Sequence, residues 1–211
     1  MTNLTNKPAL YRWLFFVLVL IISIAVSVRW VLRAPTAIPE VVLTIGESYA
    51  QMIKDSTPGV IEPNTLSWGY YYVNKAARLR FNDPPYGFIT PTAAPKFFVV
   101  SYDNGIIGII HISPQVESLS LDDALNVIFD LQNQWRKGGW ILTRPGDSPA
   151  YEDTLAEREL ARKNDSPTTY WSAGDKYQIM LFLQRVKDPV PGQERYLIHI
   201  EIAKPWIPKE L

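Results

Sequence analysis

Residues 96–112 read KFFVVSYDNGIIGIIHI, and this stretch predicts a β-hairpin in the middle of the chain. Two runs rich in β-branched and aromatic residues, 96–102 and 106–112, flank a turn that begins at Asp103 and Asn104. The Asn-Gly pair in this turn readily adopts the positive φ angles that a tight hairpin needs. We therefore expect an antiparallel sheet.

The strongest helix signal follows directly, after Ser120. Apolar residues recur there in steps of three and four, which places them on one stripe of a helix. Ser120 has the side chain of an N-cap, and Asp122 and Asp123 suit the positive end of the helix dipole. Gly138 and Gly139 end the pattern. The stripe consists of Leu121, Leu125, Ile128, Leu131 and Trp135.

The remaining elements are shorter or close the chain. Two long alternating runs at the C-terminal end predict a second hairpin. Together with the main helix, these patterns predict an α+β fold in which an antiparallel sheet packs against one main amphipathic helix. Further strands are expected at 66–73, 77–81, 140–143, 176–186 and 195–203, and further helices at 46–56 and 151–163.

An apolar run near the N-terminus predicts a transmembrane helix over residues 13–32. No charge interrupts it before Arg29, and 20 helical residues span about 30 Å, the thickness of a bilayer's hydrocarbon core. Trp13 and Trp30 lie near its ends, where indole rings favour the headgroup level. Arg29 is close enough to one end for its charge to reach the interface.

This run divides the chain into four predicted segments. They are a cytoplasmic tail at 1–12, an anchor at 13–32, a linker at 33–45 and an exported domain at 46–211. Basic residues flank the run equally, so the free α-amino group decides for a cytoplasmic N-terminus. A cleaved signal peptide is the alternative, because Ala25-Val26-Ser27 offers the small residues that a cleavage site needs.

Composition excludes several classes of function. The first 33 residues carry four basic and no acidic groups, so the remainder has 17 basic against 21 acidic residues. A net charge of −4 argues against nucleic acid as a partner, because nucleic acid requires a basic surface. The chain has no cysteine and hence no disulfide, thiol nucleophile or thiolate metal site.

Catalytic patterns are not found either. His111 and His199 each lie in the middle of a predicted strand, and we interpret both as solvent-facing strand positions rather than a dyad. No metal-binding or nucleotide-binding motif is present. We therefore expect that the chain is not an enzyme and binds neither a metal ion nor a cofactor. A hydrolase is the less favoured alternative. The acidic residues of 151–163 alternate with basic ones, as on a solvated helix face.

Candidate binding residues cluster in one part of the chain. Exposed tyrosine and tryptophan are enriched at protein interfaces, and the hairpin turn adds two polar positions. The alternative is that these rings simply cover a face of the sheet or pack beneath the proline-rich loop at 84–95. The candidate partner-binding residues are Trp68, Tyr70, Tyr72, Tyr86, Asp103 and Asn104.

The helix signal also carries a resemblance to a known family. The stretch 121–140, from Leu121-Asp122-Asp123 through Trp135 to Gly138-Gly139-Trp140, resembles a segment of membrane-anchored periplasmic immunity proteins of type VI secretion effectors. This resemblance implies a bacterial inner-membrane protein that neutralises a secreted toxin in the periplasm and has no enzymatic activity.

A different class of function also fits the layout. The chain could be a bitopic structural subunit of a bacterial envelope or secretion assembly. Ser23 and Ser27 have the spacing that lets two spans approach closely.

Overall fold

The computed structural model describes residues 16–21, 23, 37–63, 67–187 and 192–208. The chain divides into two units, Met1–Ala37 and Ile38–Leu211, each described here by itself. In the first unit the described residues 16–21 and 23 are helical, and the Ser23 hydroxyl donates to the Val19 carbonyl over 2.8 Å. Most of the predicted span, with Trp13, Arg29 and Trp30, lies outside the described residues. The described part contains no helix long and apolar enough to cross a bilayer.

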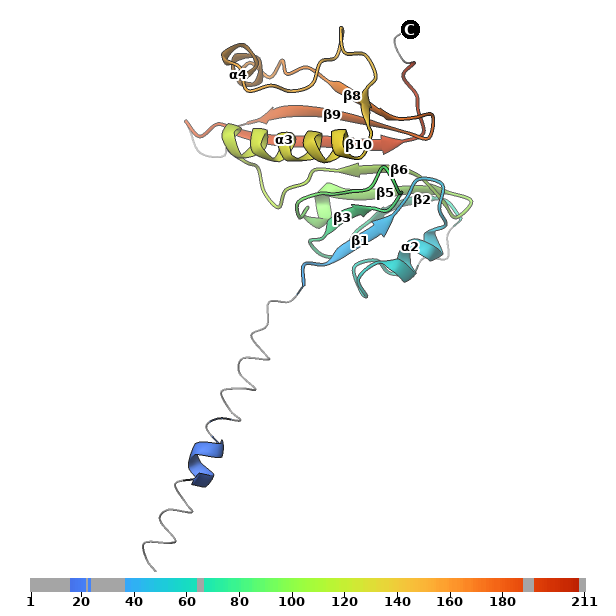
Figure 1. Ribbon diagram of the computed structural model, residues 1–211, viewed down its shortest axis with the longest axis vertical. Coiled ribbons are helices and arrows are strands. Elements are labelled where there is room, and N and C mark those ends of the chain that lie inside the picture. The colour runs from blue at the N-terminus through green and yellow to red at the C-terminus, as the bar shows by residue number, and fades with distance from the viewer. Residues whose placement is uncertain (1–15, 22, 24–36, 64–66, 188–191, 209–211) are drawn as a thin grey trace, which may run out of the picture. The chain divides into compact units, whose positions relative to one another are not determined.

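The second unit is an α+β fold built on a large antiparallel sheet, as the sequence predicts (Figure 1). The large sheet has the order β2-β5-β6-β10-β9-β8-β7, and a small sheet has the order β1-β3-β4. The strands are β1 Glu40–Leu43, β2 Gly69–Tyr72, β3 Arg78–Phe81, β4 Phe88–Ile89, β5 Phe98–Asp103, β6 Ile106–Ile112, β7 Ile141–Leu142, β8 Thr169–Ala173, β9 Tyr177–Val186 and β10 Arg195–Ala203. The helices are α2 Tyr49–Asp55, α3 Leu121–Lys137 and α4 Leu155–Arg162, with a 3-10 turn η1 at Pro95–Phe97.

Both predicted hairpins are present. Strands β5 and β6 pair in antiparallel fashion, and the turn between them has positive φ at Asn104 and Gly105, 49° and 71°. Strands β9 and β10 pair over the whole length of β10. In the strand order of the large sheet, these four strands are neighbours and form its centre.

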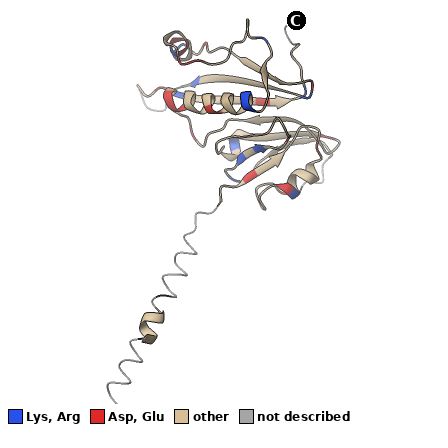
Figure 2. Cartoon of the chain, in the orientation of Figure 1, with Lys and Arg blue, Asp and Glu red and all other residues tan. Residues whose placement is uncertain are grey.

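Helix α3 forms as its sequence predicts. The Ser120 side chain accepts from the Asp123 N–H and donates to the Asp123 carboxylate at 2.7 Å, closing the N-terminal turn. Acidic residues lie in its first turn and basic residues in its last, and both interact favourably with the helix dipole and stabilise the helix (Figure 2). The apolar stripe is buried, and the helix contacts β10 and β4.

Two layers result. Helix α3 and the small sheet lie on the same face of the large sheet (Figure 1). Aromatic rings fill the space between them: Phe81 meets Tyr177 with centroids 5.1 Å apart, and Phe88 meets Trp135 at 5.8 Å. The core is thus confined to one side of the large sheet.

The structure corrects the predicted linker. Residues 38–45 were expected to belong to a linker, but Glu40–Leu43 forms β1, parallel to β3, with Val41 and Leu43 buried. A four-residue strand has too few residues to show a pattern of its own, and its partner lies 38 positions away. The folded unit therefore begins earlier than residue 46.

Other elements differ in extent. The small sheet and strands β4 and β8 were not expected, and the surface helix predicted at 151–163 is limited to α4. Strand β4 has only two residues, and its pairing with β3 depends on contacts that no local pattern reveals.

The hairpin turn gives a first prediction. Gly105 has a φ of 71°, where a Cβ atom is strained, so Gly105→Ala should lower the free energy of unfolding by about 1 kcal/mol. Urea unfolding followed by circular dichroism measures this. Gly108→Ala is the matched control, because Gly108 lies in β6 with nothing within 4 Å of an added Cβ. Equal losses in the two variants would contradict the proposed turn strain.

Candidate protein-binding surface

The two faces of the large sheet differ sharply in burial. Directly paired residues of neighbouring strands share a face. One cross-strand row is buried under α3 and the small sheet; it consists of Phe98, Ile112, Ile200, Leu181 and Thr169. The adjacent row on the opposite face has no buried member; it consists of Tyr72, Val99, His111, Glu201, Met180 and Tyr170, and we call this side of the sheet the open face.

Strand β2 and the residue before it place three of the candidate aromatic residues at one edge of the sheet. Tyr70 and Tyr72 lie on the open face with 71% and 58% of their surface exposed, and Trp68, just before β2, is 70% exposed. The intervening Tyr71 points the other way: its hydroxyl donates to the Asn74 side chain at 2.8 Å. Three large aromatic side chains therefore face solvent at one edge.

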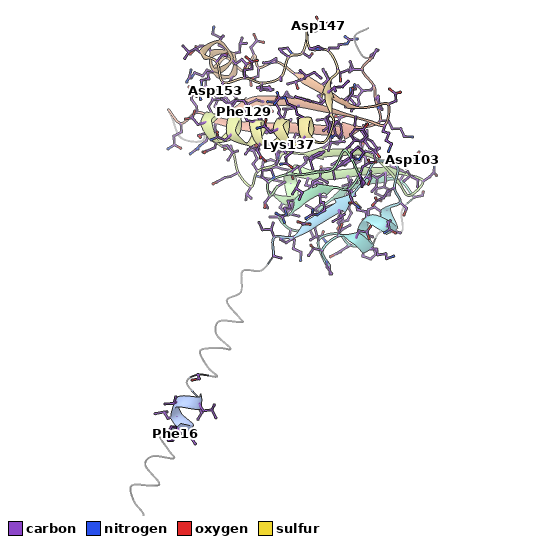
Figure 3. The ribbon with its side chains drawn as sticks, in the orientation of Figure 1. Phe16, Asp103, Phe129, Lys137, Asp147 and Asp153 are labelled. Carbon is purple, nitrogen blue, oxygen red and sulfur yellow. The ribbon has the colours of Figure 1, made fainter. Side chains whose placement is uncertain are left out.

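The hairpin turn lies beside the same edge. Asp103, labelled in Figure 3, and Asn104 are exposed. The Gly105 N–H donates to the Ser67 carbonyl at 2.9 Å, next to Trp68 in the sequence. The structure thus brings five of the six candidate residues together.

Tyr86 lies elsewhere. Its ring packs edge-on against Trp140 and Tyr177, at 5.9 and 6.4 Å, and Lys176 Nζ lies 6.0 Å from its centroid. Tyr177 belongs to the covered side of the sheet. This ring serves packing, which is the alternative the sequence left open for the group.

A groove of about 410 Å³ runs along the centre of the open face. Lys96, Phe97, His111, Phe182, His199 and Glu201 are among the residues that line it. His111 Nδ1 lies 3.4 Å from Glu201 Oε2. The His199 ring stacks on Phe182 with centroids 4.5 Å apart, and its Nε2 lies 2.8 Å from Gln184 Oε1. The groove therefore combines flat rings with charged groups of both signs.

Sequence reasoning missed this meeting of the histidines. Each was placed correctly in the middle of a strand, but the pairing of β6 with β10 puts His111 opposite Glu201, two residues from His199. Only the register of the sheet brings them into one groove. Among the described residues, no group of three or more histidine, aspartate or glutamate side chains is arranged to hold a metal ion.

The environment of His199 gives a prediction about pH. Burial lowers the pKa of His199 below its ordinary value. As the pH falls below about 6.5, the unfolded chain then binds more protons at this site than the folded one, so stability decreases. We expect the wild type to lose stability relative to His199→Gln between about pH 7 and pH 5. Thermal melts of both proteins across this range test it; parallel curves would contradict it.

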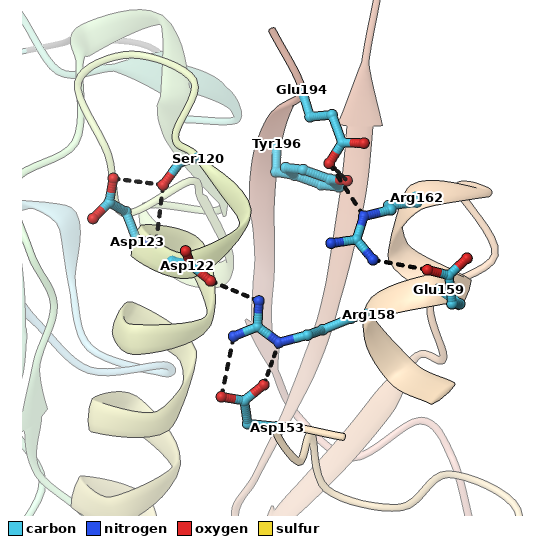
Figure 4. A network of polar contacts seen from close by, with 9 residues as sticks. All are labelled: Ser120, Asp122, Asp123, Asp153, Arg158, Glu159, Arg162, Glu194 and Tyr196. Atoms are coloured by element: carbon cyan, nitrogen blue, oxygen red, sulfur yellow. Dashed lines mark hydrogen bonds and ion pairs between the residues drawn. The ribbon is translucent and has the colours of Figure 1, made fainter. Parts of the chain in front are cut away.

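The charged segment around α4 has a structural role (Figure 4). Arg158 pairs with Asp122 at the start of α3 at 2.6 Å and with Asp153 at 2.5 Å, and this guanidinium lowers the pKa of Asp153. Arg162 pairs with Glu159 and Glu194. These contacts join α4 to α3 and to the start of β10.

A second hollow, of about 480 Å³, lies at the turn between β3 and β4. Asp83 lines it but is mostly buried, and its Oδ2 accepts from the Tyr177 hydroxyl at 2.5 Å. Lys176 Nζ lies 3.4 Å from the same oxygen. This carboxylate therefore joins the small sheet to β9.

The open face is bounded at one end by the C-terminal segment, where Gln178 Oε1 accepts from the Ile207 N–H at 2.9 Å. Between this segment and β2, strands β5, β6, β10 and β9 present their outer side chains to solvent.

Comparison of the chain with protein-family models, curated proteins and solved structures found no match to any of them.

Proposed function

We propose that this chain is a membrane-anchored protein that sequesters a protein partner on the open face of its large sheet. The most concrete form is an immunity protein that neutralises a secreted toxin in the bacterial periplasm, with residues 13–32 as a single span in the inner membrane and the N-terminus in the cytoplasm. The observation that supports it best is the sheet face itself: no described helix covers it, and aromatic, apolar and histidine side chains lie on it beside charged groups such as Glu201.

The size of this face suits a protein ligand. Its cross-strand row covers six strands, which at about 4.8 Å per strand corresponds to about 24 Å. A typical specific interface buries about 800 Å² on each partner, so a face of this width can supply one. The groove is partly open to solvent and bordered by charges, which suits side chains of a protein better than a fully enclosed small molecule.

Electrostatics support the choice of partner. The part of the chain after residue 33 carries a net charge of −4. A basic partner would be attracted before contact, which raises the association rate. A toxin with a basic surface is a partner that this negative net charge would attract.

The test begins with identification of the partner. The tagged full-length chain is solubilised in mild detergent from its native cells, and co-purifying proteins are identified by mass spectrometry. A stoichiometric secreted protein is expected, and it should lose its toxicity in cells that produce the chain. Val99→Arg with Met180→Arg, at the centre of the open face, should weaken its binding about 100-fold.

Leu155→Arg is the matched control for these charges, because Leu155 lies on α4 with its side chain exposed. Binding by the Val99/Met180 variant as tight as that of the control would refute the proposed surface. Replacement of residues 13–32 by an unrelated span should leave protection intact. A set of resident membrane proteins that is lost on this replacement would instead support a bitopic subunit of an envelope assembly.

A further inference from the structure

Each of the two sheets ends in two edge strands. An edge strand presents backbone N–H and C=O groups that can pair with another chain, and proteins normally protect such edges. The edges here are β1 and β4 in the small sheet and β2 and β7 in the large one.

Side chains protect both edges of the small sheet. On β1, the Glu40 N–H donates to the Thr57 hydroxyl and the Val42 N–H to the Ser56 hydroxyl, both at 2.9 Å. On β4, the Gln134 amide accepts from the Ile89 N–H at 2.9 Å and donates to its carbonyl at 3.0 Å. The outward donors of both strands are thereby satisfied.

The β7 edge is too short to pair with another strand. It has two residues, and the Thr143 N–H donates to the Tyr170 carbonyl of β8 at 2.8 Å. Bonding alternates along an antiparallel pair, so Leu142 is the strand's outward residue. Its side chain is partly buried against the core.

Strand β2 is different. The Val73 N–H donates to the Phe98 carbonyl, which shows that odd-numbered residues bond towards β5. The backbone groups of Tyr70 and Tyr72 therefore point away from the sheet, and no hydrogen bond from the described residues reaches these outward groups. Glu62 lies on the covered side, where its N–H donates to the Tyr71 hydroxyl at 2.9 Å.

We infer that β2 pairs with β2 of a second copy of this chain, antiparallel and about a two-fold axis at Tyr71. In this register Tyr70 lies opposite Tyr72 of the second copy. The two-fold axis likewise places Tyr72 opposite Tyr70 of the second copy. Each pair can exchange both of its backbone hydrogen bonds, so all outward groups of both strands are satisfied at once. The two sheets become one continuous sheet with a shared open face.

Two further observations favour a second copy as the occupant. The paired tyrosines lie on the same face, where cross-strand aromatic pairs are stabilising. Charges at the two ends of β2 are opposite: Asp103 lies beside its start, and Lys75 follows its end. An antiparallel arrangement brings the acidic end of one copy towards the basic end of the other, whereas a parallel one brings like charges together. This inference does not depend on the proposed function.

The absence of cysteine makes the register directly testable. Residues opposite each other in a hydrogen-bonded pair have Cα atoms about 5.5 Å apart, within disulfide range, whereas Tyr70 and its own symmetry mate are roughly 8 Å apart. Full-length Tyr70→Cys and Tyr72→Cys chains carrying tags of different mass are mixed in excess detergent micelles and oxidised. Non-reducing gels then measure the disulfide-linked dimer. Both side chains are exposed, so neither substitution disturbs the core.

We expect about tenfold more linked dimer in the mixture than with either variant alone. Leu155→Cys, exposed on α4, should remain monomeric. No linked dimer in the mixture, or equal linking by each variant alone, would overturn the inference, as would a disulfide to another protein in its place. Tyr72→Pro provides a second measurement: it removes an outward N–H and should abolish the dimer in sedimentation while the circular dichroism spectrum is kept.

Discussion

Replacement of Trp135 by alanine is expected to lower the free energy of unfolding by about 3–5 kcal/mol, because it empties the centre of the core. This side chain is fully buried, and its ring lies 5.8 Å from Phe88 and 5.7 Å from Trp171. It thus joins α3, the small sheet and the large sheet. Urea unfolding followed by tryptophan fluorescence or circular dichroism measures the loss.

A pair of conservative variants separates packing from hydrogen bonding. The Trp135 Nε1 atom is buried and has no hydrogen-bond partner among the described residues, whereas Trp171 Nε1 donates to the Thr169 hydroxyl at 2.8 Å. Trp135→Phe removes an unpaired donor, while Trp171→Phe leaves a buried hydroxyl without its donor. Trp135→Phe should therefore lower the free energy of unfolding less than Trp171→Phe does. The reverse order would contradict this account of the core.

The second large effect is expected at Gln115, which is 4% exposed and acts as a clamp between backbone segments. Its Nε2 donates to the carbonyls of Tyr196, at 3.0 Å, and Glu117, at 2.8 Å, and its Oε1 accepts from the Ile198 N–H at 2.8 Å. Gln115→Leu keeps the volume but leaves the buried Ile198 N–H without its acceptor and removes two bonds to carbonyl groups. We expect a loss of about 1–3 kcal/mol in the free energy of unfolding.

Gln51→Leu is the control for this substitution. Gln51 lies exposed on α2, and its side-chain amide donates to the exposed Asp55 carboxylate, so the loss on its replacement should stay within about 0.5 kcal/mol. Similar losses for both glutamines would show that the Gln115 clamp contributes little. Gln132 and Gln134 bond to backbone groups in the same way, at Tyr151 and Ile89.

The parts of the fold that could be predicted are those with a local physical cause. The turn at Asn104 needs residues that tolerate positive φ, and α3 needs an N-cap, an apolar stripe and a glycine stop. Each of these signals lies within a few residues of the element that it specifies. The outward orientation of Tyr70 and Tyr72 on β2 has the same kind of cause, because strand alternation alone requires some of these rings to face outwards.

Features that join distant segments could not be predicted in this way. Strand β1 was interpreted as linker because its partner β3 lies far along the chain. The four-residue length of β1 and the two-residue length of β4 leave no periodicity to read. The sequence around Gln115 gave no sign of its burial, since two of its three partners are backbone atoms 81 and 83 residues away.

The sequence by itself determined the α+β class, the two hairpins and the main helix, because backbone preference and side-chain periodicity act over a single turn or strand. Only the tertiary structure decided which strands are neighbours. That choice left one face of the large sheet open, brought His111 and His199 into one groove and left β2 as the unprotected edge. Strand order and register depend on burial and hydrogen bonding between segments far apart in the chain, and no local pattern encodes those contacts.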